Sequence, residues 1–380
     1  RAQGASEASL RRASLSAEGS RGDHTFTLEV ELAHRYAVHA EARGGLSQGL
    51  EWSGKLNSLS VEAGGELQLA SPAALDFGPD HIRLGAARLR GEKADVKSEI
   101  LSWSPHEILA RGRLSGAQIH PGLSDPLRVR THRSALLFGA EWNVQLREHA
   151  NGLVHVFREG GDLVVGEETP VALGISELEI IAAATDDRLA LSVNAVGRRS
   201  GRLSASVTAE AQRSGGRWRL APNQPLLGRA QIAIPNVDWL GPLVDANLRT
   251  VGGFSGDFSF SGTPAAPVAS GSIQGEKLGL VMVDQGLRLA GGKLRMRFDA
   301  DRVYLDELSF VSPNRVRPDE GRIDYKALTA EPGKASAKGK IELASGLGIF
   351  QLEADRLPIL QHHNRWLLIS GQGQVASTWK

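Results

Sequence analysis

Residues 188–213 read RLALSVNAVGRRSGRLSASVTAEAQR, and this stretch decides the fold. Apolar residues alternate with more polar ones on both sides of a Gly- and Arg-rich break at 197–202. Successive side chains of a β-strand point to opposite faces, so each run predicts a strand with one apolar face. The alternating apolar residues are Leu189, Leu191, Val193 and Ala195, and then Leu203, Ala205, Val207, Ala209 and Ala211.

The same alternation recurs along most of the chain. It is clear at 26–32, 36–42, 258–260 and 294–298, and it never gives way to a long helical period. A long chain of amphipathic strands must either close on itself or expose a long apolar surface. The pattern therefore predicts an all-β protein with very little helix.

Turn-forming residues separate the alternating runs and predict hairpins. The clearest are Asp186-Asp187, Ser214-Gly215-Gly216 and Asp299-Ala300-Asp301, because Gly, Asp and Asn favour tight turns. Without crossover helices, consecutive strands are expected to pair antiparallel. Glycines inside the strands allow the bends that a curled sheet requires.

Composition excludes several classes of function. The 380 residues carry 44 Lys and Arg against 43 Asp and Glu, well interspersed, so no basic face for nucleic acid is expected. There is no cysteine, which removes disulfides, thiol catalysis and cysteine-based zinc sites. No stretch reaches the roughly 18 apolar residues of a membrane span.

No catalytic or metal-binding constellation stands out. His149 and His155 are evenly separated, but no ligand set surrounds them, so surface histidines are the better interpretation. Acidic pairs such as Asp186-Asp187 and Glu167-Glu168 are neighbours in turns, where carboxylates are usually solvated. No nucleophile elbow or phosphate-cradling glycine loop opens a helix. We expect no enzymatic activity, no cofactor and no metal site.

One helix is predicted, over Val237–Leu248, with Asn236 as its N-cap and Pro242 inside it. The chain otherwise shows no domain boundary, so residues 1–380 are expected to form one continuous β-groove with a change of direction near 222–252. Because it begins with Arg1 and ends beside an alternating run, we expect a fragment of a longer protein. An N-terminal anchor and a complete C-terminal domain are not expected within it.

Several sequence segments that join the predicted strands resemble segments of one protein family. AQIAIPNVDWLGPL at 230–243, FSFSGTPAAPVASGSI at 258–273 and EADRLPILQHHNRWLLISGQGQV at 353–375 are similar to the TamB family. This family, the translocation and assembly module inner-membrane component, lies within the larger AsmA-like group. The similarity covers most of the chain and is strongest from about Gly160 to the end.

The resemblance implies a fold and a role. TamB-like proteins fold as a β-taco, a long curled sheet that forms a U-shaped apolar groove. They are anchored in the inner membrane of Gram-negative bacteria, cross the periplasm and meet TamA, an Omp85-class barrel, in the outer membrane. They are implicated in glycerophospholipid transport between the membranes and in outer-membrane biogenesis. Both membrane contacts would lie outside this chain.

The apolar register of each clear strand is the predicted groove lining. The residues alone also allow a dry sandwich core; the resemblance favours an open groove that holds acyl chains. The predicted lining residues are Phe26, Leu28, Val30, Leu32, Val144, Leu146, Leu189, Leu191, Val193, Val207, Ile232, Ile234, Phe258, Phe260, Ile273, Leu294, Met296, Phe298, Val303, Leu305, Ile341 and Leu343.

Two other functions remain compatible with this pattern. A ligand-free structural β-solenoid would need a regular rung length, which the sequence lacks. A periplasmic chaperone or assembly scaffold for outer-membrane proteins would use the same apolar trough and the free strand edges for strand addition. Lipid preference and the direction of transport are not encoded in any recognisable pattern.

Overall fold

The computed structural model describes residues 10–32, 36–63, 65–118, 136–165, 170–313, 330–343, 345–362 and 365–378. These ranges contain one four-residue helix and otherwise strands and turns. The strands of the N-terminal half are β1 (Leu10–Ser20), β2 (Asp23–Leu32), β3 (Tyr36–Leu46), β4 (Trp52–Ala63), β5 (Glu66–Leu69), β6 (Ala73–Gly78), β7 (His81–Leu84), β8 (Ala87–Arg90), β9 (Asp95–Trp103), β10 (Ile108–Gln118), β11 (Leu137–Leu146), β12 (Ala150–Gly160), β13 (Val164–Val165) and β14 (Val171–Ala172). They continue with β15 (Ile175–Thr185), β16 (Arg188–Gly197), β17 (Gly201–Ser214), β18 (Arg217–Leu220), β19 (Leu227–Ile234), β20 (Leu248–Thr263), β21 (Ala266–Met282), β22 (Leu287–Asp299), β23 (Arg302–Ser312), β24 (Gly333–Glu342), β25 (Leu347–His362) and β26 (Arg365–Thr378).

Twenty-four of these strands form one antiparallel sheet, as the alternation predicts. Most strands pair with the strands before and after them in the chain. Near the N-terminal end β4 pairs with both β5 and β6, and β7 and β8 then both pair with β9. The small β18 pairs only with the end of β17, and β19 takes over the rest of that strand. β13 and β14 form a separate two-stranded sheet.

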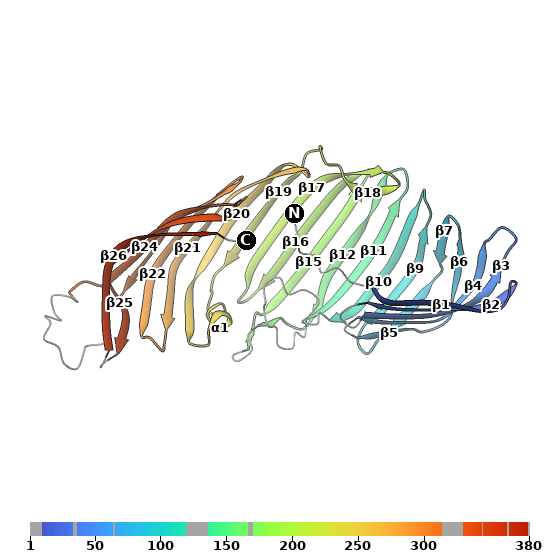
Figure 1. Ribbon diagram of the computed structural model, residues 1–380, viewed down its shortest axis with the longest axis horizontal. Coiled ribbons are helices and arrows are strands. Elements are labelled where there is room, and N and C mark those ends of the chain that lie inside the picture. Colours follow the sequence, from blue (N-terminus) through green and yellow to red (C-terminus); the bar gives the residue numbers. More distant parts are fainter. Residues whose placement is uncertain are drawn as a thin grey trace.

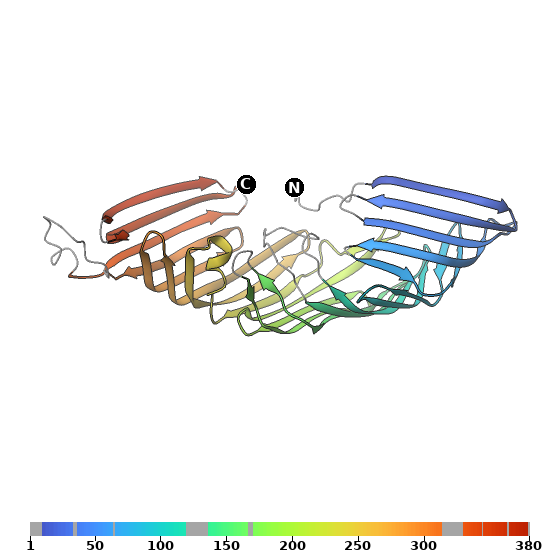
Figure 2. The same ribbon diagram turned by 90° about the horizontal axis from the view of Figure 1, so that it is seen from below.

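The sheet is long and curved. Figure 1 shows the strands side by side along the long axis, and Figure 2 shows both ends of the sheet rising above its middle, so that the sheet has a concave side. About 20 strand-to-strand steps of about 4.8 Å give a curve roughly 95 Å long. The chain exposes 23942 Å², whereas a compact monomer of this mass would expose about 14,600 Å². The predicted all-β curled sheet is therefore confirmed.

The predicted hairpins are present at all three positions. Thr185 pairs with Arg188 across Asp186 and Asp187, whose φ angles are 46° and 70°. Two positive φ angles define the type I′ turn that matches the twist of paired strands. Ser214 pairs with Arg217 in the same way, and Asp299 pairs with Arg302.

The predicted helix over Val237–Leu248 is wrong in its length and in its cap. Only α1 (Gly241–Val244) is helical, and Asp245 is already extended. Asn236 does not cap it: its Oδ1 accepts a hydrogen bond from the Asp238 N–H at 3.0 Å, which closes a turn instead. Pro242 at the start and the extended Asp245 leave one turn of helix. Among the described residues, no helix is long and apolar enough to span a membrane.

Glycine beneath an aromatic ring lets the sheet curl. The Trp52 indole lies over Gly54, where an added Cβ would be 2.6 Å from the ring and from the Gly44 Cα. Side chains crowd on the concave side of a curved sheet, so a missing side chain there makes room for a large neighbour. Gly112 stands in the same relation to Trp142, its partner across the strands.

Candidate binding groove

One face of the sheet carries an unbroken row of apolar residues. Cross-strand pairing follows this row over fifteen successive strands, from β8 to β25, without meeting a polar side chain. Its members are Leu89, Val96, Leu114, Ala140, Val156, Ile180, Val193, Ala205, Ala230, Phe258, Gly271, Phe298, Val303, Ile341 and Gly348. Because each member faces its partner directly, the row forms a continuous apolar strip along the molecule.

The opposite face is charged. Ion pairs link neighbouring strands there, such as Arg113 to Glu141 at 3.6 Å and Arg295 to Glu307 at 3.3 Å. Exposed pairs of this kind contribute little to stability. Their presence shows which side of the sheet faces water, and so the apolar side is the one that encloses the concavity.

The registers bring most of the predicted lining residues together. All but Leu343 lie within strands, on the face of the apolar row. Leu343 was predicted to line the groove, but it follows the last residue of β24 in a turn and is 57% exposed. The alternation in the sequence runs on past Glu342, but the strand does not.

The apolar face is only half covered. Of the predicted lining residues, Val303 alone is buried, while Leu28 is 37% and Leu191 43% exposed. A sandwich core would bury such residues completely. The pattern of exposure therefore describes an open groove over most of the described sheet.

An aromatic cluster closes part of the groove at the N-terminal end. Phe26 on β2 lies 6.2 Å from Phe77 on β6, although three strand-to-strand steps would separate them by about 14 Å on a flat sheet. Trp52 stacks on Phe77 at 4.9 Å and is 1% exposed. Phe26 thus belongs to a packed core, whereas Leu28 on the same strand remains exposed.

A histidine ties this cluster to the first hairpin. The Trp52 indole N–H donates to His24 Nε2 at 3.0 Å, and His24 Nδ1 lies 2.9 Å from the Ser20 carbonyl oxygen. Since the indole can only donate, Nε2 accepts and Nδ1 carries the proton that it donates to Ser20. His24 is itself buried.

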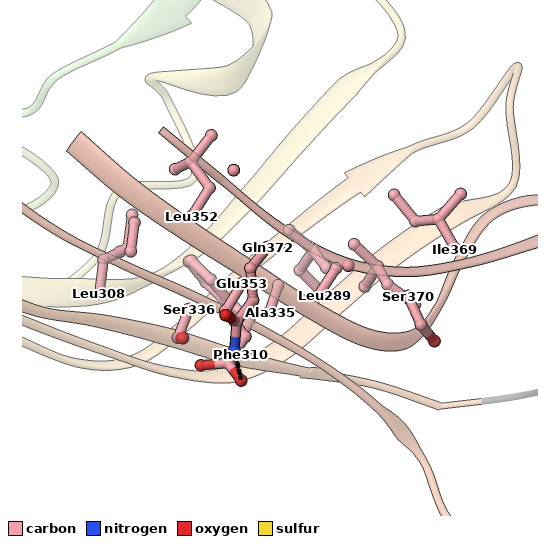
Figure 3. A pocket seen from close by; sticks show the side chains of 15 residues that line it. Leu289, Leu308, Phe310, Ala335, Ser336, Leu352, Glu353, Ile369, Ser370 and Gln372 are labelled. Atoms are coloured by element: carbon pink, nitrogen blue, oxygen red, sulfur yellow. Dashed lines mark hydrogen bonds between the residues drawn. The ribbon is translucent and has the colours of Figure 1, made fainter. Parts of the chain in front are cut away.

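An apolar cavity of about 480 Å³ lies in the groove at the C-terminal end. Leu308, Phe310, Leu352, Leu357 and Ile369 line it, with Ala335 and Ala337 at its floor. In Figure 3, Leu308, Leu352 and Ile369 rise on one side of the strands, away from the hydrogen bond of Gln372 to Glu353. The cavity is about three times the size of the engineered 150 Å³ cavity that binds benzene.

The sequence prediction missed every residue that lines this cavity. A bulge in β23 explains part of the miss, since Leu305 pairs with Met296 and Leu308 with Leu294. The extra residue turns Leu308 and Phe310 to the face of Leu305, against the alternation. Asp306 remains on the charged face, where it pairs with Arg297 at 2.6 Å. Ala335 and Ala337 alternate with more polar residues in the sequence, as do Leu352 and Ala354. This alternation, combined with the pairing of the strands, could have placed them on the groove face.

One rim of the groove carries a charged turn contact. His149, in the β11–β12 turn, lies 2.9 Å from Asp187 Oδ2, and the Ala150 N–H donates to Asp187 Oδ1 at 2.7 Å. The hydrogen bond and charge of Asp187 raise the pKa of His149 above 6.5. Burial opposes ionisation of Asp187, but the hydrogen bonds from Ala150 and His149 outweigh it and hold its pKa below 3.8.

We expect Asp187→Asn to lower the pKa of His149 toward its ordinary value. Asparagine tolerates the positive φ and can still accept from Ala150, so the variant removes mainly the charge. The raised pKa of His149 means that the contact stabilises the fold fully below pH 6.5 and less as pH rises through the raised value. At the acid end the contribution disappears as pH falls through the lowered pKa of Asp187. NMR titration of His149 in both proteins measures the shift; equal pKa values would contradict it.

The described residues contain no group of three His, Cys, Asp or Glu side chains that could hold a metal ion. His155 contacts Glu179 at 3.0 Å on the charged face. The groove therefore offers mainly apolar surface, and the ion pairs of the described residues lie on its rims and outer face.

Comparison with known families identifies the protein class. A family model described as "TamB, N-terminal domain" matches residues 4–274. The chain belongs to the TamB family, and this membership implies a bacterial envelope protein. The match begins further toward the N-terminus than the similar sequence segments suggested, and the same sheet continues beyond it to Thr378. Searches of curated proteins and of solved structures found no match.

Proposed function

We propose that this chain is a segment of a bridge-like lipid-transfer protein that conducts glycerophospholipids between the inner and outer membranes. The observation that carries the proposal is the unbroken apolar row on fifteen strands, on a face that is only half covered. Acyl chains would lie along this row while the headgroup stays in water at the open side.

The energetics favour passive sliding. Each buried methylene contributes about 0.8 kcal/mol, so an acyl chain gains on the order of 10 kcal/mol from cover. Because the row lacks polar side chains, neighbouring positions offer similar affinity and no deep trap. Direction would then come from partners or from gradients between the membranes. The periplasm as the location, an inner-membrane anchor and TamA as an outer-membrane partner follow from the family resemblance and belong to the proposal.

Native mass spectrometry with lipid extraction, on the chain purified from a bacterial periplasm, tests this function. We expect several phospholipids per chain. A stable chain without lipid would overturn the proposal and favour a ligand-free structural role.

A role as an assembly scaffold for outer-membrane proteins is the second candidate. Strands β1 and β26 stand at the two ends of the sheet, each paired on one side only among the described residues. Their open backbone groups suit strand addition by an extended segment. Recovery of outer-membrane protein fragments crosslinked to β26, in place of lipid, would favour this function.

We expect Ala337→Trp to remove about one bound lipid per chain by filling the C-terminal cavity. Ala337 is half-buried at the cavity floor, and an indole there would occupy space that an acyl chain needs. Lys338→Trp is the matched control. Lys338, the residue before Gly339, is exposed and lies on the face of β24 that points away from the cavity. Native mass spectrometry counts the lipids; equal counts for the two variants would show that the cavity holds none.

A further inference from the structure

An arginine interrupts the apolar face near the rim where β12 ends. Arg158 follows Val154 and Val156 on that face and pairs with Phe138. Beyond Phe157, β12 no longer pairs with β15, and the guanidinium lies in the gap between the two strands. A cation at the edge of an apolar groove costs desolvation energy unless something compensates it.

The contacts of Arg158 hold the guanidinium in place but do not neutralise it. Nη1 donates to the Ser176 carbonyl at 3.3 Å and Nη2 to the Gly161 carbonyl at 2.6 Å. Nε is shielded from solvent and has no partner among the described residues. The neighbouring carboxylate, Asp162, is already used by the backbone N–H groups of Leu163, Gly174 and Ile175 at 2.8–2.9 Å.

Two further arginines come to the same loop. The Arg198 N–H donates to the Gly174 carbonyl and the Arg199 N–H to the Leu173 carbonyl, both at 2.9 Å. The turn that carries them is therefore packed on the segment that Asp162 organises. Within the described ranges, none of the three arginines has a carboxylate within ion-pair distance. Arg158 is therefore a cation on the apolar face that forms no ion pair with the described residues, beside a loop that also contacts the turn of Arg198 and Arg199.

We propose that Arg158 binds the phosphate of a phospholipid headgroup whose acyl chains lie in the groove, with Arg198 and Arg199 of the adjoining turn adding positive charge beside it. This inference rests on the proposed function and adds a site to it. Each terminal nitrogen of Arg158 keeps a second N–H free, and the planar guanidinium fits phosphate oxygens with two parallel hydrogen bonds. The carbonyl contacts orient it in advance, which lowers the entropy lost on binding.

Two lipids with the same acyl chains separate the site from the groove. Phosphatidylglycerol and diacylglycerol are titrated against a fluorescent acyl probe bound to the whole chain. We expect phosphatidylglycerol to bind about tenfold more tightly, as charge-assisted hydrogen bonds would give. Arg158→Met should remove this preference and leave diacylglycerol binding unchanged. Arg202→Ser is the matched control, because Arg202 adjoins the same turn but pairs with Val196 and Ala233 on the outer face.

The outcomes distinguish the two proposals. Equal binding of both lipids by the unchanged chain would overturn the phosphate site and keep the lipid groove. If neither lipid binds, the proposed function itself is overturned. Tight binding of inorganic phosphate to the lipid-free chain, at the affinity gained by the headgroup, would assign the site to free phosphate. If Arg158→Met fails to fold, the double variant Arg198→Ser, Arg199→Ser in the turn carries the same test.

Discussion

Aspartate in place of Met296 is expected to reduce phospholipid transfer about tenfold or more while the sheet remains folded. Met296 is half-buried on the groove face, between Ile273 and Leu305 on the flanking strands. An acyl chain passing this point would have to desolvate an unpaired carboxylate, which costs several times the 1.4 kcal/mol of a tenfold effect. Because its partially open surroundings let water reach the carboxylate in the lipid-free chain, folding survives. Transfer of labelled phospholipid between donor and acceptor vesicles measures the effect.

Lys293→Asp controls for the new charge. Lys293 lies on the same strand, is exposed and pairs with Ser309 on the outer face. The Lys293→Asp variant introduces the same aspartate side chain on the outer face, away from the groove. Transfer should therefore remain at the level of the unchanged protein. Equal transfer by all three proteins would show that lipid does not pass along this face. If Met296→Asp alone loses the β-sheet circular dichroism of the protein, or the hydrogen-exchange protection of β22, Met296 belongs to a structural core instead.

Alanine in place of Trp52 is expected to destabilise the N-terminal end by about 3–5 kcal/mol. The indole is 1% exposed, stacks on Phe77 and is the donor to His24 Nε2. Its removal leaves a cavity and an unsatisfied histidine nitrogen at once. Hydrogen exchange should accelerate in β2–β7 and remain unchanged in β20–β26, because distant strands share no pairing with the cluster.

Trp103→Ala provides the comparison for this variant. Trp103 occupies the same cross-strand row through Ile82 and Phe77, but it is 44% exposed. Its loss should change stability by about 1 kcal/mol or less. If both tryptophan variants lowered stability equally, the packed cluster would have no special role at this end.

Two-residue periodicity and turn chemistry were enough to predict the architecture. Asp186-Asp187 and Ser214-Gly215-Gly216 were identified as hairpins because the residue types required by positive φ stand between alternating runs. The helix was overestimated because apolar spacing over Val237–Leu248 resembles a helical face, whereas Leu248 already begins β20. The local spacing of apolar residues could not reveal that Leu248 is paired in the sheet instead.

The candidate groove was predicted less completely, for two physical reasons. Bulges reverse the alternation without changing the residue types, and so Leu308 and Phe310 were left out of the predicted lining. Curvature also decides which apolar residues touch each other across the concavity. Phe26 and Phe258 have the same local pattern, yet one belongs to the packed cluster and the other to the open row.

The order of pairing gives this protein a unit of length. From β20 to β25 each strand bonds only to the strands before and after it. Excising one whole hairpin, such as β22 with β23, would bring together two strands that still run in opposite directions. The span would shorten by about 10 Å, two strand spacings. The length of such a protein can therefore be increased or decreased in steps of one hairpin, by adding or deleting whole hairpins.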